Sequence, residues 1–127
     1  MDQKILIVDD EAHIRLLIEQ TLEELEDFGV ELITADNGVD ALEFIKTAKP
    51  RLVFLDVMMP RMNGFDVCQQ VKRDLGMHDV FIVMLTAKGQ EFDRQRGEQV
   101  GADVYMTKPF DPDEILAQAQ QVLGIQV

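Results

Sequence analysis

The sequence contains little of several residue types, and each shortage excludes a class of protein. Its 127 residues include one cysteine, one tyrosine and no tryptophan. The lone cysteine, Cys68, cannot form an internal disulfide, which is typical of a reducing compartment. No apolar run approaches the length needed to cross a bilayer. The first residues, MDQKILIV, are too short and reach acids too soon to form a signal peptide. We therefore expect a soluble, cytoplasmic protein that does not associate with membranes.

Basic residues are also scarce. Twelve lysines and arginines face 24 aspartates and glutamates, which gives a formal net charge of -12. Such a field repels nucleic-acid phosphates and anionic lipids, so direct DNA binding is not expected. The same field attracts cations and the basic surfaces of partner proteins.

Short apolar runs alternate with segments of helical periodicity along the chain. The first run, KILIV at 4–8, is short, apolar and β-branched, which fits a strand that is buried on both faces. The expected strands are 4–8, 30–35, 52–56, 80–85 and 104–107. The expected helices are 11–29, 38–50, 64–75, a weak one over about 89–100, and 112–123 after an N-cap at Asp111. This alternation predicts one α/β domain over residues 1–127, an open parallel sheet with helices on both faces.

The helical apolar positions predict which side chains face the core. In the first helix they include Leu17 and Phe28, and in the third they include Cys68, Val71 and Leu75. We therefore expect these side chains to be buried.

Polar residues stand at the carboxyl ends of the expected strands, where open α/β sheets place their sites. These residues are Asp9, Asp10, Asp56, Thr86 and Lys108, the last followed by Pro109. Taken singly, an aspartate after a strand is more often a helix N-cap, and a loop lysine is usually only solvated. Together they place carboxylates, a hydroxyl and an ammonium at one edge.

The adjacent carboxylates of "IVDDEA" need a compensating charge. Two carboxylates about 4 Å apart repel by roughly 4 kcal/mol at an effective dielectric near 20. A divalent cation reverses the sign of that interaction. Oxygen ligands suit Mg²⁺ best, and Mg²⁺ in turn suits phosphate. The sequence therefore predicts a magnesium site formed by these aspartates.

The segments "ILIVDDE", "LVFLDVMMPRMNGFD", "VMLTAKG" and "GADVYMTKPF" resemble the signature segments of response regulator receiver domains of two-component signalling. The resemblance spans the chain in order. It implies a flavodoxin-like (βα)5 fold with a five-stranded parallel sheet of order 2-1-3-4-5. It also implies a phosphorelay function for a single receiver domain of the chemotaxis type, with no output domain within residues 1–127.

The resemblance assigns roles to the acidic residues. Asp56 would accept a phosphoryl group from the phosphohistidine of a sensor histidine kinase or phosphotransfer protein. Asp10 would bind Mg²⁺ directly and Asp9 through water. Asp56 and the backbone carbonyl of Met58 would complete the protein's share of ligands. Lys108 would supply positive charge for the transferred oxygens.

Further residues would couple phosphorylation to a change of surface. Thr86 would donate a hydrogen bond to the phosphoryl group, and Tyr105 would turn toward the space this opens. The family usually has a cis peptide before Pro109. Pro60 and Gly64 would shape the loop after Asp56, where glycine can adopt positive φ.

Other functions fit the sequence less well. A haloacid-dehalogenase-like phosphatase would need a D-x-D motif after the first strand and a cap domain. A flavodoxin would need a Ser/Thr/Gly-rich phosphate loop where this chain has acidic "DDEA". A receiver-like protein-interaction module without phosphorylation would not need all five polar groups. We therefore expect a phosphoacceptor that catalyses its own phosphorylation and dephosphorylation, and not an enzyme with a separate substrate.

The expected partner surface has few complementary charges. Arg94 and Arg96 supply bases in the expected fourth helix, but Val104 stands where dimerising receivers commonly carry an aspartate. Residues 109–127 contain no lysine or arginine. A symmetric contact needs both signs, because each patch meets its own copy. We therefore expect a monomer or weak dimer that presents this surface to a different downstream protein.

Overall fold

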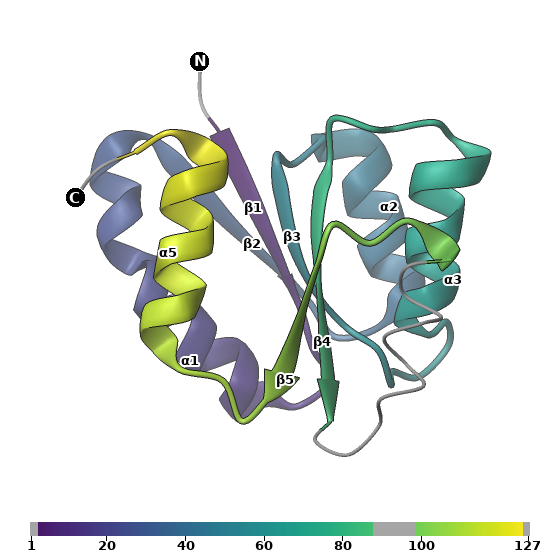
Figure 1. Ribbon diagram of the computed structural model, residues 1–127, viewed down its shortest axis with the longest axis horizontal. Helices are drawn as coiled ribbons and strands as arrows, with labels where there is room; N and C mark the ends of the chain where they lie inside the picture. The colour runs from purple at the N-terminus through teal and green to yellow at the C-terminus, as the bar shows by residue number, and fades with distance from the viewer. Residues whose placement is uncertain (1–2, 88–98, 126–127) are drawn as a thin grey trace.

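The computed structural model describes residues 3–87 and 99–125 (Figure 1). Five strands and four α-helices alternate along these residues, and all strands point toward the lower edge of Figure 1. The strands are β1 (Gln3–Val8), β2 (Val30–Ala35), β3 (Leu52–Asp56), β4 (Phe81–Ala87) and β5 (Val104–Lys108). The helices are α1 (Ala12–Leu22), α2 (Gly38–Ala48), α3 (Gly64–Gln69) and α5 (Pro112–Leu123).

The strands form one parallel sheet in the order β2-β1-β3-β4-β5, as expected. β1 lies beside β3, with Val8 opposite Leu55, so the two strands end side by side. The interior strands are apolar at consecutive positions because both faces of the sheet are covered. All five residues of β3 are buried.

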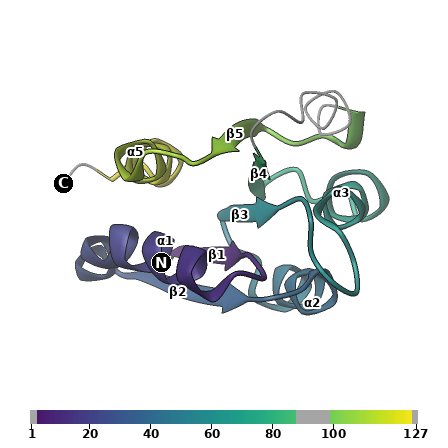
Figure 2. The ribbon, with the colours of Figure 1, turned by 90° about the horizontal axis from the view of Figure 1, so that it is seen from below.

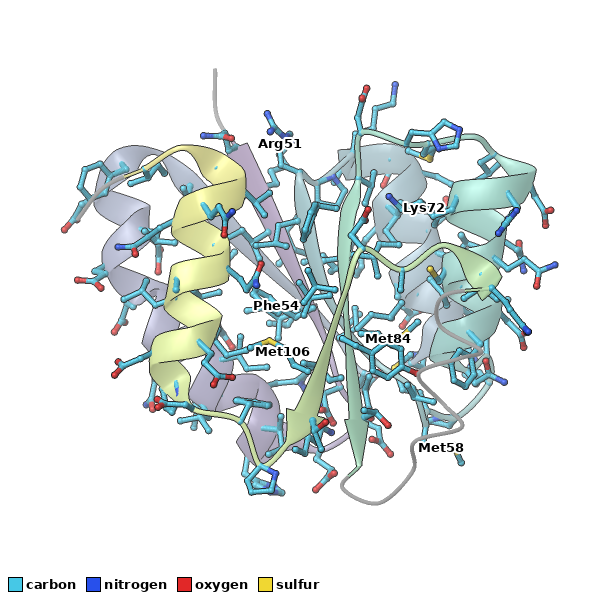
Figure 3. All side chains as sticks on the ribbon, viewed as in Figure 1. Arg51, Phe54, Met58, Lys72, Met84 and Met106 are labelled. Atoms are coloured by element: carbon cyan, nitrogen blue, oxygen red, sulfur yellow. The ribbon has the colours of Figure 1, made fainter. Side chains whose placement is uncertain are left out.

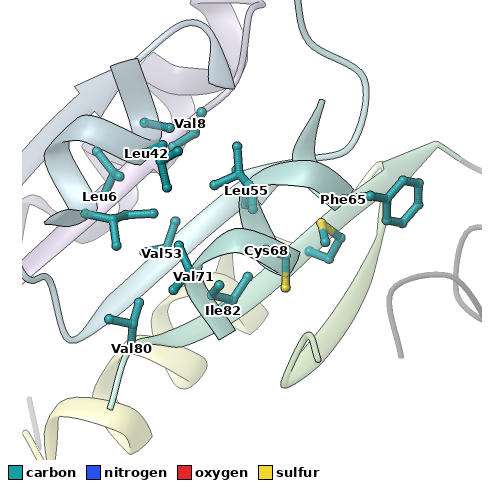
Figure 4. Packing of buried hydrophobic residues seen from close by; sticks show 14 of the residues in the cluster. Leu6, Val8, Leu42, Val53, Leu55, Phe65, Cys68, Val71, Val80 and Ile82 are labelled. Atoms are coloured by element: carbon teal, nitrogen blue, oxygen red, sulfur yellow. The ribbon is translucent and has the colours of Figure 1, made fainter. Parts of the chain in front are cut away.

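The helices form two separate layers, one on each face of the sheet (Figure 2). Alternate side chains of each strand pack against these two layers. On one face Leu6, Val53 and Ile82 contact α2 and α3, as Figure 4 shows from close by. On the other face, Phe54 and Met106 pack with residues of α1 and α5 (Figure 3). This burial on both faces confirms the predicted α/β sheet.

The first helix differs from its prediction. The α-helix ends at Leu22, and residues Glu23–Phe28 continue as a 3₁₀-helix up to Gly29, whose φ is 84°. The expectation that Leu17 and Phe28 are buried is wrong, because they are 38% and 51% exposed. A 3₁₀-helix has about 3 residues per turn, so the α-helical spacing that places Phe28 inward does not apply beyond Leu22.

The third helix also changes its winding. After α3, residues Gln70–Asp74 form a π-helical turn that carries Lys72 into the interior. The Lys72 ammonium donates to the Val80 carbonyl and lies 2.8 Å from the Asp103 carboxylate. Cys68 and Val71 are buried as predicted, but Leu75, at the end of the π-turn, is 45% exposed. A single α-helical period could not predict this wider turn.

The last helix follows its prediction closely. The Asp111 side chain accepts a hydrogen bond from the Asp113 N–H, and Pro112 occupies the first turn. The weak helix expected over 89–100 falls outside the described residues, apart from helical Gln99 and Val100. Arg94 and Arg96 lie outside them as well. Among the helices of the described residues, none has the length and apolar composition that crossing a membrane requires.

Candidate functional site

The carboxyl ends of β1 and β3 bring the predicted aspartates together. Asp9 and Asp10 follow β1, and Asp56 is the last residue of β3. One carboxylate oxygen from each lies within 4.8 Å of the others. Asp9 and Asp56 are buried, with 0% and 6% of their surface exposed, whereas Asp10 is exposed. The cluster therefore has two buried carboxylates, those of Asp9 and Asp56, and one exposed carboxylate, that of Asp10.

Lys108, at the end of β5, reaches into this cluster. Its Nζ lies 2.7 Å from Asp9 Oδ2 and 3.3 Å from Asp56 Oδ1. Glu11 also approaches it, with Oε1 at 3.8 Å. The peptide between Lys108 and Pro109 is cis, as the resemblance implies. Sequence reasoning did not place Glu11 in the site, although its position next to Asp10 was the signal that could have done so.

The backbone around Asp9 is held by several hydrogen bonds. The Asp9 N–H donates to the Ala35 carbonyl at 3.2 Å, and Asp9 Oδ1 accepts from the Glu11 N–H at 2.9 Å. Arg15 Nη1 donates to the Asp9 carbonyl oxygen at 2.7 Å. Asp9 therefore has both carboxylate oxygens and both backbone groups engaged. Sequence reasoning missed Arg15, because a residue one turn into a helix carries no sequence signal of such a contact.

The electrostatics of the site favour bound positive charge. Burial, followed by the charges of Asp9 and Asp10, outweighs the opposing effect of Lys108 and raises the pKa of Asp56 from 3.8 to about 7. Burial alone lowers the pKa of Lys108, but its hydrogen bonds and charge pairs with Asp9 and Asp56 leave that pKa raised. One lysine thus leaves the repulsion among the carboxylates only partly offset.

Thr86 lies beside this cluster on the next strand. Leu85 pairs with Asp56 across β3 and β4, and the Val57 N–H donates to the Leu85 carbonyl at 3.1 Å. Thr86 follows directly and is buried, with 4% of its surface exposed. Tyr105, on β5, pairs with Met84 of β4 and packs against the core on the side of α2 and α3. Because side chains alternate along a strand, Thr86 and Tyr105 project from the same face of the sheet.

The loop after Asp56 is shaped by close backbone contacts. The Gly64 N–H donates to the Val57 carbonyl at 2.8 Å, and the Met62 N–H donates to the Pro60 carbonyl at 2.8 Å. Met58 extends from this loop and is 67% exposed (Figure 3). The expectation of positive φ at Gly64 is wrong, since in this loop it is Arg61 that has φ 71°. Glycine is needed at 64 for space.

Replacing Gly64 by alanine is expected to destabilise the protein. The added Cβ would lie 2.3 Å from the Asp56 carbonyl oxygen, so the backbone that carries Asp56 must shift. Forcing atoms into a packed region costs about 1–3 kcal/mol or more. Urea unfolding should show this loss. The control is Gly76→Ala, where no atom lies within 4 Å and only the φ of 64° opposes the substitution, at about 1–2 kcal/mol. A smaller loss for Gly64→Ala than for the control would contradict the steric account.

The residues present fit a hard divalent cation. The clustered atoms are carboxylate oxygens, with no sulfur or imidazole among them. Oxygen-only donor sets suit Mg²⁺. Both carboxylate oxygens of Asp9 already accept hydrogen bonds, from Lys108 and Glu11, whereas buried Asp56 accepts from Lys108 with Oδ1 and Asp10 is exposed. Asp10 and Asp56 are therefore the carboxylates best placed to bind an ion directly.

The chain is similar in sequence to known proteins. The family model of the response regulator receiver domain matches residues 5–120. The chain is 46% identical over 123 residues to the alkaline phosphatase synthesis transcriptional regulatory protein PhoP of Bacillus subtilis, covering 97% of this chain and 49% of that protein. It is 45% identical to the phosphate regulon transcriptional regulatory protein PhoB of Pseudomonas aeruginosa, covering 94% of this chain and 51% of that protein. The chain thus spans about half the length of these relatives.

Solved structures show the same fold. The BeF3-activated DrrB receiver domain matches with a TM-score of 0.85 and 30% identity, covering 98% of this chain and 100% of that chain. The chemotaxis response regulator CheY4 of Vibrio cholerae matches with a TM-score of 0.81 and 34% identity, covering 96% of this chain and 99% of that chain. These matches agree with the strand order and the two helical layers.

Proposed function

The chain belongs to the family of response regulator receiver domains, and from that premise we propose that it accepts a phosphoryl group on Asp56 in a Mg²⁺-dependent reaction. The observation that carries this proposal is the placement of Asp56. Its carboxylate is buried, lies within 4.8 Å of Asp9 and Asp10 and contacts the Lys108 ammonium. Such a carboxylate is a nucleophile surrounded by the groups that a phosphoryl group needs.

In the proposed transfer, an Asp56 carboxylate oxygen forms a bond to phosphorus. The phosphorus–nitrogen bond of a phosphohistidine donor breaks, and its electron pair stays on the imidazole nitrogen. The Lys108 ammonium then donates hydrogen bonds to the new phosphoryl oxygens, and the Thr86 hydroxyl donates to another phosphoryl oxygen. Asp10, Asp56, the Met58 carbonyl and, through water, Asp9 would hold Mg²⁺, which would supply positive charge to those oxygens when bound.

The proposed output is a change of surface that begins at Thr86. Thr86 and Tyr105 project from the same face of β4 and β5, so movement of the Thr86 hydroxyl toward a phosphoryl group changes the space beside Tyr105. Tyr105 is half-buried and already borders the core. A rotation of its ring would therefore alter the surface near β5 without unfolding the sheet.

The proposed partners follow from this chemistry. The donor is a histidine kinase or phosphotransfer protein, and the target is a protein that recognises the surface near β5. The matched relatives are named as transcriptional regulators, but the chain covers about half of each. At a net charge of -12 these 127 residues repel DNA, so we propose that they act through protein contact.

The test of this function is covalent labelling. Incubation with acetyl phosphate and Mg²⁺ is expected to raise the intact mass by one phosphoryl group, because the small donor replaces the kinase. Treatment with EDTA should prevent the adduct, and hydroxylamine, which cleaves acyl phosphates, should remove it. A chain whose mass stays unchanged with acetyl phosphate, and also with a phosphorylated kinase of this family, is no phosphoacceptor.

A further inference from the structure

The peptide group that joins Asp9 to Asp10 has a dedicated side-chain partner. Arg15, in the second turn of α1, donates from Nη1 to the Asp9 carbonyl oxygen at 2.7 Å. That oxygen belongs to the peptide plane whose nitrogen is that of Asp10. The direction of the carbonyl therefore constrains how the backbone enters Asp10, from which the Asp10 carboxylate extends.

In the part of the chain that the structure describes, Arg15 donates to a backbone carbonyl and not to one of the nearby carboxylates. An arginine beside clustered carboxylates would ordinarily pair with one of them. Within residues 3–87 and 99–125, however, the Arg15 guanidinium lies within 4.0 Å of no carboxylate and bonds to a carbonyl instead. Arg15 is half-buried, so this hydrogen bond is partly shielded from water.

Asp10 depends on such support more than its neighbours do. Asp9 is held through its N–H, its carboxylate and Lys108, and Asp56 is held within β3 and by Lys108. Asp10 follows the end of β1, precedes α1 and is exposed. Its orientation is therefore set by the backbone on either side of it.

We propose that Arg15 is a positioning residue for the metal site, which orients the Asp9–Asp10 peptide so that Asp10 faces the ion. This rests on the proposed function, because it assumes that the aspartates bind Mg²⁺. Groups that orient metal ligands typically contribute 10- to 100-fold to affinity. A positive charge near the carboxylates has the opposite influence, because it repels the ion. Geometry and charge therefore predict opposite effects when Arg15 is replaced.

The experiment measures Mg²⁺ affinity by isothermal titration calorimetry for Arg15→Met and Arg15→Lys. Arg15→Met removes both the charge and the hydrogen bond, whereas Arg15→Lys keeps the charge on a side chain without the planar fork of donors. Positioning predicts weaker binding for both variants, on the order of 10-fold. Equal or tighter binding by Arg15→Met, or wild-type binding by Arg15→Lys, would overturn the inference.

Arg61→Met is the matched control. Arg61 lies in the loop after Asp56 and its side chain is 58% exposed, with Asp40 at 3.8 Å. This substitution removes the same charge without touching Asp9, so unchanged or tighter Mg²⁺ binding is expected. Weakening equal to that of Arg15→Met would show a general effect of charge removal and overturn the inference.

Two further measurements separate positioning from misfolding and from failure of the function itself. Unfolding midpoints in EDTA show whether each variant is folded, and if Arg15→Met is not, Arg15→Lys decides. Labelling by acetyl phosphate should need more Mg²⁺ in the variants but reach the wild-type rate at saturation. A reduced rate at saturating Mg²⁺ with unchanged half-saturation contradicts positioning. Failure of the wild-type chain to bind Mg²⁺ or to be labelled counts against the proposed function instead.

Discussion

Replacing Asp56 by asparagine is expected to reduce labelling by acetyl phosphate to background. An amide has no anionic oxygen to attack phosphorus, while its size and shape match those of the carboxylate. The Asp56 side chain is 8% exposed. Asp9 is more buried still and already accepts hydrogen bonds from Glu11 and Lys108. Intact-mass spectrometry at saturating Mg²⁺ measures the result.

Asp27→Asn is the matched control for this substitution. Asp27 is exposed and precedes β2, at the opposite edge of the sheet from the strand ends that form the site. The variant loses the same charge and should be labelled at the wild-type rate. Labelling of Asp56→Asn at the wild-type yield would show that the acceptor is another residue, and peptide mapping of the adduct would then identify it.

The same substitution is expected to stabilise the metal-free protein at alkaline pH. In the folded chain burial, followed by the charges of Asp9 and Asp10, raises the pKa of Asp56 to about 7 from its ordinary value of 3.8. The folded state thus holds a proton that the unfolded state releases, and stability falls as pH rises between these values. Asparagine has no proton to lose. From pH 5 to pH 8, the unfolding free energy of the wild type should therefore fall by about 2–3 kcal/mol relative to that of the variant.

Urea unfolding in EDTA at the two pH values measures this gap. Mg²⁺ should offset this loss of stability in the wild type, because the ion binds the native carboxylates and not the unfolded chain. At a concentration 100 times its dissociation constant, a ligand stabilises the native state by about 2.7 kcal/mol. The wild type should gain this stability at pH 8, and Asp56→Asn should gain less. A gap that stays constant from pH 5 to pH 8 would mean that Asp56 ionises as an ordinary carboxyl group.

Local pattern was sufficient to predict most of the scaffold. Short apolar runs indicated each strand, most plainly in the interior strand β3, because a strand covered on both faces needs no polar positions. The parallel order then placed Asp9, Asp10, Asp56, Thr86 and Lys108 at one edge, since the carboxyl ends of parallel strands meet there. Pro112 and Asp111 likewise marked the start of α5, because an N-cap is decided by a few neighbouring residues.

Features that depend on contacts between distant residues required the tertiary structure. The π-turn at Gln70–Asp74 accompanies an ion pair between buried Lys72 and Asp103, 31 positions apart in the chain. Gly64 is needed because the Asp56 carbonyl passes within 2.3 Å of the place where a Cβ would stand.

The hydrogen bonds within the site also required the tertiary structure. The sequence by itself determined which carboxylates gather, because local patterns mark the strand ends and the resemblance to receiver domains implies the strand order. Only the tertiary structure decided how they are held, with Arg15 on the Asp9 carbonyl and Glu11 near Lys108. The physical reason is that hydrogen bonds of long side chains depend on the path of the folded backbone, which no periodicity in the sequence records.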